Sequence, residues 1–180
     1  IAGGVSQGVF QAHQMEFAVN YQLVNTNKFM VGDKDTASLF DNLNSNYIYA
    51  RIAYGITEKL TMSIESGYFI NKTQYGLEKM DTVKSSGIAD LILFPRYSLY
   101  TRNTDKTKTE ITVGMGFKIP LGKYNDSDVV YRNPSTGAKY YTTSPPTVQP
   151  TNGSQDFIFY GFLFRSYTEK EINFFTNILY

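Results

Sequence analysis

Apolar and polar residues alternate with a period of two along most of this chain, and no other feature restricts the fold as strongly. Between residues 14 and 24, the odd positions from Met15 to Leu23 are all apolar, and the even positions from Gln14 to Gln22 are polar except for Ala18. Successive side chains point to opposite faces of a β-strand, whereas the same apolar positions would scatter around a helix. The segment therefore predicts a strand with one apolar face and one polar face.

The same alternation recurs along the chain and predicts an all-β fold in a single domain over residues 1–180. We expect seven strands, at residues 14–24, 47–57, 60–71, 89–100, 109–121, 156–167 and 172–180. Short polar connections alternate with long ones: the short ones are 57–59, 101–108 and 168–171, and the long ones are 25–46, 72–87 and 122–155. Short turns at one rim and long loops at the other are typical of antiparallel up-and-down transmembrane β-barrels.

The longest connection, residues 122–155, is predicted to be a long extracellular loop. Within it, the strand-like segments 129–132 and 138–141 flank the turn-forming sequence Asn-Pro-Ser-Thr-Gly, which predicts a hairpin that projects beyond the barrel. Residues 144–154 are rich in turn-forming residues, proline and asparagine among them, and for this part of the loop we expect a mobile segment.

Charged residues within the predicted strands avoid the apolar face. Eight of them lie on the opposite face and are predicted to line the lumen of a barrel: Glu16, Arg51, Glu65, Asp90, Arg96, Glu110, Lys118 and Asp156. The apolar face carries only Arg165, which lies beside a short turn. An Arg or Lys on the lipid face costs about 2–4 kcal/mol at the bilayer midplane, so a membrane barrel is expected to exclude charge from that face.

Aromatic residues on the apolar face lie near the ends of successive strands, alternately at the long-loop rim and at the short-turn rim. These residues are Tyr21, Tyr54, Tyr68, Tyr97 and Phe117. Aromatic belts at the two lipid interfaces would produce this alternation, although Tyr and Phe are also good strand formers in soluble proteins. We therefore expect the lipid bilayer of a Gram-negative outer membrane as the principal partner.

The composition offers little catalytic chemistry. The chain has 180 residues, a net charge of +1, no cysteine and a single histidine. Without cysteine there is no thiolate metal site, and a near-neutral charge does not favour nucleic-acid binding. No nucleophile with a neighbouring base, phosphate loop or metal-binding motif can be assembled. We expect no enzymatic activity, no cofactor and no bound metal.

Two cross-strand pairs of opposite charge are predicted from the short turns. If residues 57–59 form a three-residue turn, Ile56 pairs with Leu60 and Arg51 lies directly opposite Glu65. The same reasoning brings Arg96 near Glu110. Such pairs either close a narrow, plugged lumen or line a path that selects solutes.

Short motifs recur where long loops return to strands. Two segments have the form G-x-x-D, Gly87-Ile88-Ala89-Asp90 and Gly153-Ser154-Gln155-Asp156, and between them lies Lys118-Ile119-Pro120-Leu121-Gly122. With the turn at residues 54–60, these motifs resemble the family of outer-membrane transporters labelled as proteins of the meta-pathway of phenol degradation. The resemblance covers about residues 47–167. It implies a barrel and the passage of small compounds, apolar or aromatic ones included.

Three functions are compatible with the sequence. The leading hypothesis is a passive outer-membrane channel or transporter for small molecules. The alternatives are a structural or surface-interaction barrel with a plugged lumen, and a soluble lipocalin-like binding barrel. The sequence leaves the solute and the oligomeric state open.

The number of predicted strands affects this interpretation. Bacterial single-chain barrels close with an even number of strands, so seven strands predict that further strands follow Tyr180 and that the barrel is incomplete. A competing sign is that Ile172, Phe174, Ile178 and Tyr180 alternate like the closing strand of a barrel.

Overall fold

The computed structural model describes residues 8–38, 40–76, 82–125 and 127–180. Antiparallel strands make up most of these residues: β1 (Met15–Thr26), β2 (Met30–Val31), β3 (Lys34–Asp35), β4 (Asn42–Thr57), β5 (Leu60–Tyr75), β6 (Thr82–Ile88), β7 (Asp90–Asn103), β8 (Thr107–Pro120), β9 (Ser127–Arg132), β10 (Lys139–Thr143), β11 (Asp156–Tyr167) and β12 (Ile172–Leu179). One turn of 3₁₀ helix, Thr168–Lys170, joins β11 to β12. No helix in the described part of the chain is long and apolar enough to cross a membrane.

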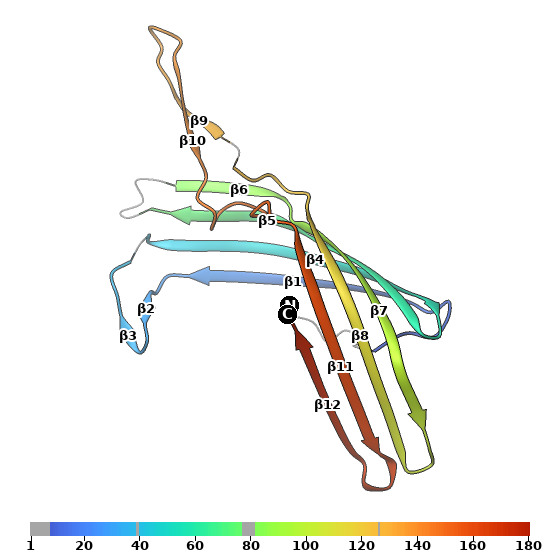
Figure 1. Ribbon diagram of the computed structural model, residues 1–180. Helices are drawn as coiled ribbons and strands as arrows, with labels where there is room; N and C mark the ends of the chain where they lie inside the picture. Colours follow the sequence, from blue (N-terminus) through green and yellow to red (C-terminus); the bar gives the residue numbers. More distant parts are fainter. Residues whose placement is uncertain (1–7, 39, 77–81, 126) are drawn as a thin grey trace.

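Seven of these strands form one sheet in the order β1-β4-β5-β7-β8-β11-β12, and β6 adds an eighth at the far end of β5. The spatial order follows the order in the chain, and every pair is antiparallel, so the connections run up and down. The sheet curls into a half-barrel, and the β9–β10 hairpin extends away from it (Figure 1). The predicted all-β, antiparallel, up-and-down architecture is confirmed, with the expected seven strands in an incomplete barrel.

The two faces of the sheet have opposite chemistry. The outer face carries large apolar side chains open to the surroundings, with Phe17 65% and Phe157 61% exposed. The inner face carries buried polar and charged side chains, among them Arg51, Thr61 and Thr112. A water-soluble domain buries its apolar side chains and leaves most charged ones exposed. In this sheet the distribution is inverted.

Glycines on the inner face make room for aromatic rings. The Tyr47 ring lies directly over Gly67, where a Cβ atom would collide with it, and it also packs on Phe69 with 4.5 Å between ring centroids. The Phe94 ring occupies the corresponding space at Gly116, 2.8 Å from where a Cβ would lie. A glycine on one strand therefore allows a large ring from a neighbouring strand to lie against the backbone of the sheet.

The turn between β4 and β5 differs from the prediction. Thr57 pairs with Leu60, so the turn has two residues rather than three, and the predicted pairing of Ile56 with Leu60 is wrong. The Thr57 hydroxyl accepts the backbone N–H of Leu60 at 3.1 Å. Ile56 is an extra residue in a β-bulge. The bulge offsets the shorter turn, and Arg51 still lies opposite Glu65 as predicted.

The strands on both sides of this turn extend further than the alternation indicates. β4 begins at Asn42 and β5 ends at Tyr75, within segments predicted as loops. A second bulge near Ile70 reverses the direction of the side chains that follow in β5. Continued alternation from Leu60 predicts Asn71 on the polar face, but it is paired with Asn46 on the outer face. These extensions carry polar residues on both faces, so periodicity could not detect them.

We predict that Gly67→Ala destabilises the sheet by about 1–3 kcal/mol, because the added methyl group displaces the packed Tyr47 ring. The matched control is Gly161→Ala, since nothing lies within 4 Å of a Cβ at that position. Thermal unfolding of both variants in detergent provides the comparison. Equal stability of the two variants would show that the ring is not seated on the backbone.

Candidate functional site

The first cluster on the inner face, here called the Arg51 cluster, comprises Glu16, Tyr49, Arg51 and Glu65. β1, β4 and β5 bring these side chains together at adjacent positions of the register. Arg51 Nη2 lies 3.8 Å from Glu16 Oε1, and Arg51 Nε lies 3.7 Å from Glu65 Oε1. The Tyr49 hydroxyl donates a hydrogen bond to the second oxygen of Glu65. Sequence reasoning missed Tyr49, although it lies two residues from Arg51 on the same face.

Two members of the Arg51 cluster are almost shielded from solvent, whereas Glu16 is partly exposed. Arg51 is 5% exposed and Glu65 is 8% exposed. A buried charge requires a partner, because losing one partner of a buried pair costs about 3–5 kcal/mol. The contacts therefore fix the registers of β1, β4 and β5 relative to one another.

The predicted approach of Arg96 to Glu110 is not produced by the register. Arg96 lies opposite Gly114, whereas Glu110 lies opposite Thr101. β7 and β8 extend to Asn103 and Thr107, so the turn is shorter than expected, and a bulge near Leu99 shifts the alignment further. The alternation of apolar and polar residues contains no information about the length of a turn.

Both charged residues instead contact the segment that precedes β1. Residues 8–14 turn back over the inner face, with the Phe10 ring 5.7 Å from the Arg96 guanidinium carbon. The Phe10 N–H donates to Thr61 Oγ1 at 2.7 Å, and the Val9 N–H donates to Glu110 Oε1 at 3.4 Å. Phe10 is 5% exposed. This segment covers the short-turn end of the inner face and was not predicted.

The second cluster, here called the Lys118 cluster, comprises Asp90, Lys118, Thr151, Ser154 and Asp156. Lys118 forms an ion pair with Asp156, and its Nζ lies 3.5 Å from Asp90 Oδ2 and 3.0 Å from Ser154 Oγ. The Thr151 hydroxyl donates to Asp90, and the Ser154 hydroxyl donates to Asp156 Oδ2 at 3.0 Å. One cation is thus held between two carboxylates at the long-loop rim.

The Lys118 cluster brings together the two repeated G-x-x-D motifs and the K-x-P-x-G motif. Each G-x-x-D motif supplies its aspartate, and the K-x-P-x-G motif supplies the lysine. Gly87 and Gly153 have positive φ angles, 144° and 77°, which residues with side chains rarely adopt. At Gly122 a Cβ atom would collide with the carbonyl oxygen of Ile88. The glycines permit the backbone turns that direct both aspartates toward one lysine.

The predicted interface aromatics lie on the outer face. Tyr21 donates from its hydroxyl to Asn46 Oδ1 at 2.7 Å, and the Tyr54 hydroxyl lies 2.8 Å from His13 Nδ1. Tyr68 and Tyr97 are exposed, whereas Phe117 is half-buried against Phe157, with 5.2 Å between ring centroids. Arg165 is exposed on the same face, and its guanidinium carbon lies 5.1 Å from the Tyr167 ring.

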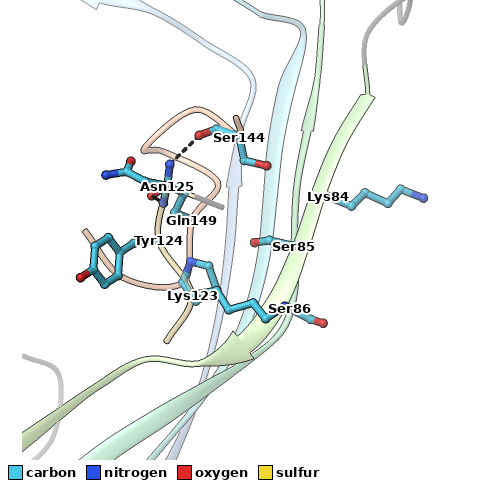
Figure 2. Close-up of a pocket in the computed structure, with 9 residues that line it drawn as sticks. Lys84, Ser85, Ser86, Lys123, Tyr124, Asn125, Ser144 and Gln149 are labelled. Atoms are coloured by element: carbon cyan, nitrogen blue, oxygen red, sulfur yellow. Dashed lines mark hydrogen bonds between the residues drawn. The ribbon is translucent and has the colours of Figure 1, made fainter. Parts of the chain in front are cut away.

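A pocket of about 150 Å³ lies where β6 meets residues 123–125 and 144–150 (Figure 2). The Gln149 side chain occupies one side of it, accepting the Asn125 N–H at 3.1 Å and donating to the Ser144 carbonyl at 2.5 Å. Lys84 points away from the pocket, and Lys123 extends across it toward Ser86 (Figure 2). Within the described ranges, no group of three histidine or carboxylate side chains is arranged to hold a metal ion.

Comparison with known proteins adds no functional assignment. No protein-family model matches this chain, and no curated protein does.

We predict that exchanging the charges of Arg51 and Glu65 restores most of the stability that either single change removes. Arg51→Glu alone or Glu65→Arg alone should cost about 3–5 kcal/mol, because each leaves like charges buried together. The double variant still places a carboxylate beside Glu16, so adding Glu16→Gln should recover more. Thermal unfolding of the single, double and triple variants measures the coupling.

The matched control for the charge exchange is the exposed pair Lys106–Glu169, whose side chains are 3.2 Å apart. Exchanging its charges should change stability by at most about 1 kcal/mol, because exposed ion pairs contribute little. A double Arg51/Glu65 variant that loses the sum of the two single effects would contradict the pairing.

Proposed function

We propose that this chain forms the wall of a β-barrel in the bacterial outer membrane and that the barrel lets small solutes pass. The observation that carries the proposal is the inverted polarity of the sheet. Its convex face is apolar and exposed, and its concave face is polar and buried. A lipid bilayer is the surrounding in which such an outer face is stable.

The extent of the apolar face supports the membrane over water as its surroundings. Transferring one large apolar side chain out of water is favourable by about 1.5–3 kcal/mol. On β1 alone the outward side chains from Met15 to Leu23 are all more than half exposed. A soluble lipocalin-like barrel would turn these residues inward around its ligand. The opposite arrangement favours the membrane barrel over that alternative.

The boundary of the apolar face supports the same proposal. Beyond Ile48, the residue of β4 that is paired with Tyr21, the outer face of β4 and β5 changes from apolar side chains to amides. Asn46 is hydrogen-bonded to Tyr21 and to Asn71, and Asn71 Nδ2 lies 3.5 Å from Asn44 Oδ1. A tyrosine that joins an apolar surface to a polar one is typical of a membrane interface. The strands of 12–16 residues extend beyond the 9–11 residues that a tilted spanning strand requires.

The inner wall supports passage of small molecules that carry no strong negative charge. Arg51 and Lys118 each lie between two carboxylates, so both cations are neutralised and each cluster keeps one negative charge in excess. Aromatic rings lie between the clusters, with the Phe94 and Tyr160 centroids 5.7 Å apart in an edge-to-face arrangement. A wall with both polar and aromatic surface agrees with the small apolar or aromatic compounds that the family resemblance implies.

A structural barrel with a plugged lumen is the second candidate. The observation that favours it is the segment over residues 8–14, which lies on the inner face with Phe10 almost completely buried. Flux of a small sugar through liposomes that contain the full chain distinguishes the candidates. Flux in the wild type supports the channel, flux that appears only in Phe10→Gly supports a lumen plugged by residues 8–14, and no flux in either supports a lumen closed by other residues.

The membrane placement has its own test in a pair of lysine substitutions. Val19→Lys puts a charge on the outer face in mid-strand, and Asn20→Lys puts it on the inner face. We expect Val19→Lys to destabilise the barrel in lipid by about 2–4 kcal/mol and Asn20→Lys to have little effect. The free energy of folding into lipid vesicles is measured for both variants by titration with urea. If Val19→Lys is as stable as Asn20→Lys, and the chain is soluble without detergent, the outer face does not contact lipid.

A further inference from the structure

The segment over residues 144–154 is not the mobile loop that its composition suggests. Val148 is fully buried, Gln149 is 7% exposed and Thr151 is 5% exposed. The Val148 and Gln149 N–H groups both donate to the Pro145 carbonyl, at 2.9 and 3.3 Å, and form a compact turn. Buried side chains and a hydrogen-bonded backbone give this part of the loop a defined position.

The strand register places this turn on the inner face. β4 pairs with β1 without a bulge, so Ser45 points to the same side of the sheet as Arg51. Lys72 is paired with Ser45, and Ser85 is paired with Lys72, so both share that side. Groups that contact Lys72 and Ser85 therefore lie within the hollow of the sheet, at its long-loop end.

Two consecutive carbonyl oxygens attach the turn to the wall. Lys72 Nζ donates to the Gln149 carbonyl at 2.9 Å, and the Ser85 hydroxyl donates to the Val148 carbonyl. Thr147 Oγ1 donates to Gln74 Oε1 at 2.8 Å. Lys72 lies beyond the apolar part of β5 and is partly buried. Its ammonium group is the one charged donor among these contacts.

The following residues are tied to the next strands of the same wall. Thr151 donates to Asp90 at the start of β7, and Lys118 on β8 contacts Asn152 at 3.5 Å and Ser154 at 3.0 Å. The segment thus runs along the inner face from β5 and β6 past β7 to β8, where β5, β7 and β8 are successive strands of the sheet, and is held at both ends. The Lys118 cluster, which unites the repeated motifs, provides the second attachment.

We propose that residues 145–151 form the constriction that sets the largest solute admitted at the long-loop mouth, and that Lys72 is the residue that positions it. This rests on the proposed channel function. A segment fixed inside the hollow narrows the opening by its own width. Its contacts with Lys72 and Ser85 are therefore specificity-determining even though neither residue has to touch a solute.

The position of the constriction is tested without measuring transport. The chain has no cysteine, so Ser45→Cys, beside Lys72 on the inner face, gives a single reactive thiol. A bulky maleimide should label it about tenfold faster in Lys72→Met, because a hydrogen bond from a charged donor is worth enough to shift a local opening equilibrium by that factor. Ser85→Ala should accelerate labelling in the same direction.

The matched control is Lys84→Met, which removes the same charge from an exposed position next to Ser85 in β6. It should leave the labelling rate unchanged. Equal labelling rates in Lys72→Met, Ser85→Ala and Lys84→Met would overturn the assigned role of Lys72.

Solute flux then tests the constriction itself. Liposome swelling with a monosaccharide and a trisaccharide gives a ratio of rates, which should rise in Lys72→Met and remain at the wild-type value in Lys84→Met. Flux with an unchanged ratio overturns the constriction but not the channel. No flux of either sugar in any variant overturns the channel function and the constriction with it.

Discussion

Strand register is the constraint on which the rest of this structure depends, because a slip of one residue would exchange the two faces of a strand. The Arg51 cluster makes such a slip costly, since it would move a charge from a buried set of partners to the apolar outer face. The β-bulges change the register or the facing of side chains locally. At Ile56 a bulge preserves the alignment despite a shorter turn, and near Ile70 a bulge turns Lys72 inward where the sheet leaves its apolar region.

The alternation of residue types was sufficient to predict the apolar part of the seven strands and its two faces, because face and period are linked by backbone geometry. It also placed Arg51 opposite Glu65, although the turn assumed for that pairing was wrong. It did not predict β6 or the polar extensions of β4 and β5. Turn lengths and bulges could not be predicted, because one added or omitted residue leaves the alternation on each side unchanged. For the same reason Arg96 is displaced from Glu110 by four positions in the register.

The Lys118 cluster and the inward segments could not be deduced for a different reason. The repeated G-x-x-D motifs are visible in the sequence, but their convergence on one lysine requires β7 and β11 to be the two neighbours of β8. The contacts of Phe10 and Val148 likewise join residues 51 or more positions apart. Such tertiary contacts order a segment whose composition alone indicates a loop.

The inner segments obtain their order from hydrogen-bonding groups that the wall holds in place. Thr61 accepts the N–H of Phe10, Ser85 donates to the carbonyl of Val148, and the charged Lys72 amine donates to the carbonyl of Gln149. Without them these backbone groups would be buried without partners. Two short lengths of backbone can therefore occupy the hollow, one near each rim, without an apolar core around them. In both clusters a cation lies between two carboxylates, which weakens the field in the hollow and leaves each cluster with one negative charge in excess. For the proposed channel, the width left between the inner segments is then the main basis for discrimination among uncharged solutes.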